Sequence, residues 1–165
     1  MSKITEGSLE WYRAVLNQVI SGDMSIYQNQ KDCLDLLLNM NMDLPFNENP
    51  EARKIAIKTS QYAHSLAERQ AAITGDGNFD DIYWNYLLLE APWAFESYLL
   101  YMEKNRPDSK KFYIPRKKTL QVVARDLQDL EDRIIEFYGL SLPSRVGKST
   151  MCIFFMSWIM GRRPN

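Results

Sequence analysis

Residues 138–160 read YGLSLPSRVGKSTMCIFFMSWIM and decide the fold that we predict for the end of the chain. The apolar-leaning run 138–142 predicts a short strand, although five such residues also suit the tail of a helix. Residues 143–147 then predict a tight turn. The mostly apolar residues 148–160 predict a buried helix that Gly161 ends. The order of strand, turn and helix is typical of the opening of an α/β fold.

The turn carries the pattern of a phosphate-binding loop of the Walker A kind. It reads Ser144-Arg145-Val146-Gly147-Lys148-Ser149-Thr150. In such a loop backbone N–H groups and a helix N-terminus face phosphate, the lysine reaches the β and γ phosphates, and the next hydroxyl holds magnesium. Lys148 and Ser149 are the candidates for these roles, and Thr150 would support them. The alternative is a lysine and two hydroxyls that cap an ordinary helix.

One position departs from the usual loop pattern. The form G-x-x-x-x-G-K-[ST] requires a glycine at 142, where the chain has Leu142. A lone G-K-S-T occurs often by chance. The predicted strand before it and the apolar helix after it make nucleotide binding a more specific prediction.

The first 105 residues predict helices throughout. Pro92 should kink or split the last of them, and a polar, proline-containing segment at 106–111 marks a boundary. We therefore predict a mainly α fold, with an acidic helical region at 1–105 and the start of an incomplete α/β P-loop ATPase fold at 106–165. The expected helices span about 8–20, 25–40, 50–73 and 80–104 before the boundary, and 115–137 and 148–160 after it.

The net charge of −1 hides an asymmetry between these segments. Residues 106–165 hold 12 Lys and Arg against 6 Asp and Glu, while residues 1–105 hold 8 against 15. The basic segment suits a phosphate-rich partner such as a nucleotide or nucleic acid. The alternative is that the two segments attract each other.

The two cysteines and the apolar runs indicate an intracellular protein. Cys33 and Cys152 form no CxxC pair and no secretory signal begins the chain, so we expect a reducing, cytoplasmic setting. Cys152 is predicted to be a buried small apolar residue. The most apolar run, 151–160, is about half the length of a membrane span, and we expect no membrane contact.

Two weaker metal patterns are rejected. Asp76, Asn78 and Asp80 have the spacing that opens a calcium loop, but the required glycine and glutamate are missing further on. A polar turn and helix cap is the better interpretation. His64 is the single histidine, and we predict a partly exposed helix residue rather than a metal ligand.

Four segments together resemble the large terminase subunit of tailed bacteriophages. They are FYIPRKKTL at 112–120, LQDLE at 127–131, LSLPSRVGKST at 140–150 and WIMGRRP at 158–164. They occur in the order found in that family and cover roughly residues 110 to 165. The family's Walker A loop has the form S/P-R-x-G-K-S/T and commonly lacks the first glycine, so Leu142 agrees with the resemblance.

The resemblance implies the N-terminal part of an ATP-driven motor that packages viral DNA into capsids. It implies ATP and Mg²⁺ as cofactors and double-stranded DNA, the portal and the small terminase subunit as partners of the parent protein, in the host cytoplasm. Lys148 and Ser149 would bind phosphate and magnesium, and Arg145 would be the loop arginine that stabilises the γ-phosphate in cis. Apart from the resemblance, a protein is a candidate partner for the acidic helical region.

A complete enzyme needs residues that we do not find in this sequence. Phosphoryl transfer also requires a Walker B carboxylate and a residue that positions water, and the 15 residues after Thr150 are taken up by one helix and its end. The nuclease carboxylates of the family are also missing. We therefore expect that this chain alone does not hydrolyse ATP at a useful rate.

The alternative function is a free-standing, phage-derived helical protein-interaction module whose loop is a relic. The helix at 148–160 separates the two hypotheses. In an ATPase opening its apolar residues should be exposed and cause self-association; in a module they should pack into a helical core. These residues are Ile153, Phe154, Phe155, Trp158 and Ile159.

Basic side chains outside the loop are candidates for DNA phosphate contacts. Arg116, Lys117 and Lys118 lie at a predicted helix N-terminus, where cations are unfavourable and an anionic partner is favoured. Arg162 and Arg163 are further candidates. No side chain that reads bases is identified.

Overall fold

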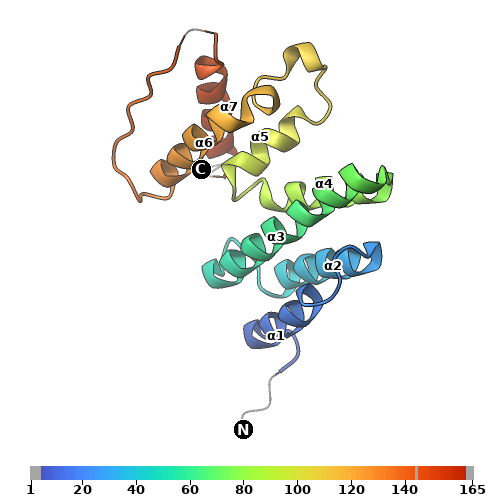
Figure 1. Ribbon diagram of the computed structural model, residues 1–165. Helices are drawn as coiled ribbons and strands as arrows, with labels where there is room; N and C mark the ends of the chain where they lie inside the picture. The colour runs from blue at the N-terminus through green and yellow to red at the C-terminus, as the bar shows by residue number, and fades with distance from the viewer. Residues whose placement is uncertain (1–4, 144, 163–165) are drawn as a thin grey trace. The chain divides into compact units, whose positions relative to one another are not determined.

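The computed structural model describes residues 5–143 and 145–162, and in these ranges it is helical without any strand. The predicted mainly α character is confirmed. The chain forms two compact units, Met1–Leu89 (the N-terminal unit) and Glu90–Asn165 (the C-terminal unit). The helices in Figure 1 are α1 (Leu9–Ile20), α2 (Tyr27–Asp43), α3 (Pro50–Thr74), α4 (Gly77–Glu90), α5 (Phe95–Glu103), α6 (Lys117–Glu131) and α7 (Lys148–Arg162), with 3₁₀ turns η1 (Asp108–Lys110) and η2 (Ile114–Arg116).

Local capping explains where several helices begin and end. The Ser8 hydroxyl accepts the N–H of Trp11 and caps α1. The Asn49 side chain caps α3, and Pro50 follows at its first position, where its missing N–H is harmless. Gly75 ends α3 with a left-handed φ of 67°, a conformation that glycine adopts without strain.

The N-terminal unit packs α1, α2 and α3 against one another. Small side chains on one stripe of α3 allow this close approach, and α4 joins the core through the Tyr86 hydroxyl, which donates to the Gln30 carbonyl at 2.6 Å. The turn before α4 is a polar cap, because Asp76 accepts the backbone N–H of Asn78. The buried small residues of α3 are Ala52, Ala56, Ser60, Ala63 and Ala67.

The C-terminal unit places α5 in contact with both α6 and α7. The Phe95 ring lies 5.2 Å from the ring of Phe155 and 5.2 Å from that of Trp158, both on α7. From α6, the Gln128 side chain accepts the N–H of Phe95 and donates to the Trp93 carbonyl. These contacts fix α7 on the surface of α5.

Proline and backbone conformation set the helix limits in this unit. The predicted break at Pro92 is confirmed, since α4 ends at Glu90 and α5 begins at Phe95. The helix predicted over 115–137 is shorter, because α6 ends at Glu131 and Arg133 takes a left-handed φ of 59°. A non-glycine residue in that region interrupts a right-handed helix.

The strand predicted over 138–142 is not formed. Residues 135–143 belong to a long irregular connection between α6 and α7, which Figure 1 shows as an arc. A strand requires a neighbour to pair with its backbone groups, and the described residues supply none. Burial and, to a smaller extent, the Asp126 carboxylate raise the pKa of the Tyr138 phenol.

The structure also tests the predictions made for Cys152 and His64. Cys152 is exposed on α7, so the prediction of a buried cysteine is wrong. His64 is half-buried on α3, as predicted, with its ring 5.8 Å from that of Tyr83. None of the helices within 5–143 and 145–162 has the length and apolarity that a bilayer crossing requires.

The compact units do not coincide with the segments 1–105 and 106–165. The structural division lies between Leu89 and Glu90, because α5 packs with the helices that follow it. The domain boundary predicted between residues 105 and 106 stays a prediction.

Candidate functional site

The candidate phosphate loop is a tight turn that leads directly into α7. Arg145 has a φ of 67° and Gly147 a φ of 103°, so left-handed residues stand on both sides of Val146. The α7 helix begins at Lys148, as the sequence predicts. Turns with left-handed residues bring backbone N–H groups toward one side and form anion-binding concavities. Ser144 lies outside the described residues.

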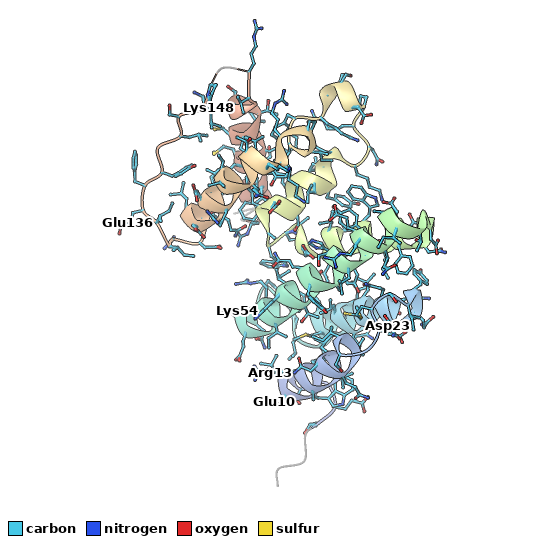
Figure 2. The ribbon with its side chains drawn as sticks, in the orientation of Figure 1. Glu10, Arg13, Asp23, Lys54, Glu136 and Lys148 are labelled. Atoms are coloured by element: carbon cyan, nitrogen blue, oxygen red, sulfur yellow. The ribbon has the colours of Figure 1, made fainter. Side chains whose placement is uncertain are left out.

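The side chains predicted to meet a nucleotide are open to solvent. Arg145, Lys148 and Ser149 are exposed, and Thr150 is half-buried. Figure 2 shows Lys148 at the beginning of α7. The first turn of α7 carries no acidic residue, so no carboxylate of this turn offsets the positive end of the helix dipole. An anion bound there would be stabilised by both the dipole and the lysine.

Gly147 lies directly on an aromatic ring. A Cβ added at this position would stand 3.0 Å from Cδ2 of Phe112, tighter than most such contacts, so the ring would have to shift by a few tenths of an ångström. Positive φ and this contact both favour glycine here. In a phosphate loop a glycine permits close approach of the backbone to the ligand; here it also permits close approach to Phe112.

Phe112 is held in place by a buried carboxylate that the sequence did not reveal. Glu103, at the end of α5, is fully buried, and its Oε1 accepts the N–H groups of Phe112 at 2.6 Å and Tyr113 at 2.9 Å. Its Oε2 accepts the N–H of Ile114 at 2.9 Å. The carboxylate thus satisfies three backbone donors of the segment that supports the loop.

The α7 helix is apolar on two faces, and only one of them is packed. Met151, Phe155 and Trp158 are buried. The indole N–H of Trp158 donates to the carbonyl of Ala91 at 2.8 Å. The opposite face remains open, with exposed fractions of 64% for Ile153, 56% for Met156 and 67% for Met160.

Arg162 closes the end of α7 and is engaged within the protein. Its guanidinium carbon lies 4.4 Å from the centre of the Trp158 ring, and Nη1 pairs with Glu131 at 3.7 Å and Asp132 at 3.9 Å. Its side chain is 16% exposed. Arg162 is therefore a structural clamp between α6 and α7 rather than an open phosphate contact. Arg163 lies outside the described residues.

The three basic residues near the start of α6 differ in the contacts that their side chains make. Arg116 donates to the Phe112 carbonyl at 3.3 Å, and Lys117 lies 4.0 Å from a carboxylate oxygen of Glu96. Lys118 is exposed. The structure brings all three to one helix end, where the first turn holds no acidic residue.

Among the described residues, no group of three or more His, Cys, Asp or Glu side chains could hold a metal. The predicted magnesium ligand, the Ser149 hydroxyl, is open to solvent.

Comparison with known proteins adds no identification. No protein-family model, curated protein or solved structure matches this chain.

Proposed function

We propose that residues 144–150 bind the phosphates of ATP and that the chain is the N-terminal part of a phage large terminase subunit. The observation that supports this most is the turn itself. Left-handed Arg145 and Gly147 lead into an α-helix whose first two residues, Lys148 and Ser149, are exposed. An ordinary helix cap requires neither the two left-handed residues nor an open lysine.

Each loop residue has a distinct chemical role in this proposal. The Lys148 ammonium neutralises the β and γ phosphates, and the Ser149 hydroxyl ligates the magnesium that accompanies them. Backbone N–H groups of the turn and the first turn of α7 donate to phosphate oxygens. The Arg145 guanidinium stabilises charge on the γ-phosphate in cis, as an arginine finger does. Bound ATP·Mg²⁺ supplies the phosphoryl group whose transfer drives DNA packaging in the parent protein.

The remaining parts of the proposal concern the parent protein. Residues 138–142 become the first strand when a sheet is present to pair with them, and Arg116, Lys117 and Lys118 contact DNA phosphate. The portal and the small terminase subunit are partners of the parent protein. Catalysis of ATP hydrolysis requires a Walker B carboxylate in addition to this loop.

Titration of the 165-residue chain with a fluorescent ATP analogue and Mg²⁺ tests the site. We expect saturable binding that Lys148→Ala weakens at least about tenfold, since one charged hydrogen bond is worth about 1.5 kcal/mol or more. Lys54→Ala is the matched control, because it removes an exposed lysine near the start of α3 that has no proposed phosphate contact. Equal affinity in wild type and Lys148→Ala would remove the basis for the proposal.

A helical interaction module is the second candidate, and the packing of α7 favours it. Phe155 and Trp158 are buried against α5, as a completed helical core requires. The N-terminal unit also has a surface groove of about 440 Å³ between α2 and α4, with the carboxylates of Asp35 and Asp81 in its lining. A chain that sediments as a monomer and shows no Lys148-dependent nucleotide binding would support this candidate instead.

A further inference from the structure

A buried carboxylate links α5 to the segment beneath the candidate loop. Glu103 is 0% exposed, and carboxylates are rarely buried to this degree unless they are paired. Its two oxygens accept three consecutive backbone N–H groups, those of Phe112, Tyr113 and Ile114, at 2.6, 2.9 and 2.9 Å. Hydrogen bonds to an ionised acceptor are the strong ones, so this segment has a fixed position relative to α5.

The fixed segment in turn supports the loop. The Phe112 ring is almost fully buried and lies so close to Gly147 that a single added carbon would approach it to 3.0 Å. The same ring lies 5.3 Å from the ring of Phe154 on α7. The turn at 145–147 follows a long irregular connection, so its position depends on α7 on one side and on Phe112 on the other.

We propose that Glu103 is a positioning residue for the phosphate loop. Its carboxylate holds the Phe112 backbone, and the Phe112 ring sets the position of Gly147 and hence of the N–H groups that begin α7. This role rests on the proposed function of residues 144–150. Glu103 does not touch the nucleotide; it acts through Phe112.

Glu103→Gln tests the role with little change in shape. The amide has one acceptor oxygen where the carboxylate has two, so at least one of the three backbone donors loses its partner. Glu90→Gln is the matched control: Glu90 is also a fully buried carboxylate of the C-terminal unit, and it accepts the Ser97 hydroxyl at 2.6 Å. Nucleotide affinity and hydrogen exchange of both variants are measured at a temperature below their thermal unfolding midpoints.

The first measurement is affinity for a fluorescent ATP analogue with Mg²⁺. We expect Glu103→Gln to weaken binding about tenfold, the equivalent of one lost charged hydrogen bond, and Glu90→Gln to change it less than about twofold. Phe112→Leu removes the ring edge beneath Gly147 and should weaken binding in the same direction, which keeps the test decisive if Glu103→Gln does not fold. Equal losses in Glu103→Gln and Glu90→Gln would overturn the inference, since they would indicate general destabilisation.

Hydrogen–deuterium exchange without nucleotide separates this inference from the proposed function. We expect faster exchange at 145–151 in Glu103→Gln but not in Glu90→Gln, including the Met151 N–H that bonds to the Gly147 carbonyl. Unchanged protection in Glu103→Gln overturns the inference. Faster exchange supports the link between Glu103 and the loop even where the wild-type chain binds no nucleotide, an outcome that refutes the proposed function alone.

Discussion

Trp158→Phe tests whether α7 belongs to the core of the C-terminal unit. The indole is 3% exposed, its N–H donates to the Ala91 carbonyl at 2.8 Å, and its ring lies 5.2 Å from that of Phe95. The guanidinium carbon of Arg162 stands 4.4 Å from its centre. Phenylalanine keeps part of the ring packing, but it lacks the indole N–H and has a smaller π surface.

The expected loss follows from three contributions. The Ala91 carbonyl loses its buried donor, which costs about 1 kcal/mol. The smaller ring buries less apolar surface, which costs about another 1 kcal/mol. The weaker cation–π contact with Arg162 costs about 0.5 kcal/mol. Together the free energy of unfolding of the C-terminal unit should fall by about 2 to 3 kcal/mol, with some of the loss recovered by repacking.

Urea denaturation followed by far-UV circular dichroism measures this loss. Trp84→Phe is the matched control, because the Trp84 indole donates to the exposed carboxylate of Asp80 at 3.1 Å and is only half-buried. We expect the control to change stability by less than about 0.5 kcal/mol. Equal effects of the two substitutions, or no effect of Trp158→Phe, would refute the packing of α7 on α5 as the source of stability.

Three further predictions concern single side chains. Burial and the neighbouring carboxylate of Asp43 raise the pKa of Tyr12 to about 12. Because the folded state favours the neutral phenol, the free energy of unfolding should fall as pH rises from 10 to 12. Tyr12→Phe should remove that fall in denaturation curves measured across this pH range. Gly147→Ala should weaken binding of the fluorescent ATP analogue about tenfold or more, because a side chain at φ 103° is strained and meets the aromatic ring below it. Native chain should react with Ellman's reagent at the exposed Cys152 only, and Cys33 should react after unfolding; two fast thiols in the native state would contradict the burial of Cys33.

The helices were predictable because their signals are local. Ser8 and Asn49 cap α1 and α3, which begin close to the predicted positions, and Pro92 separates α4 from α5. The start of α7 at Lys148 was equally predictable from the turn and the apolar run after it. Capping side chains, proline and glycine act within a few residues, so one sequence contains the information.

The predictions that the structure does not reproduce depended on distant residues. A strand at 138–142 needs a paired neighbour, and apolar alternation alone does not supply it. The burial of Cys152 depended on which face of α7 meets α5, and a helix that is apolar all round does not reveal that face. Nothing in the sequence pattern indicated that Glu103 is buried and hydrogen-bonded. Its three backbone donors lie 9 to 11 residues further along the chain, in a segment without a regular α-helix or strand.

The two faces of α7 bear differently on the two proposed functions. Burial of Phe155 and Trp158 is expected of a finished helical module, while the exposed Ile153, Met156 and Met160 leave an apolar face of α7 uncovered. Exposed apolar residues at a spacing of three to four positions form a stripe that usually meets a partner surface. The stripe fits both proposed functions, because a sheet of the ATPase or a protein partner of the module would cover it. Met156→Glu should therefore improve the solubility of this chain without weakening nucleotide binding.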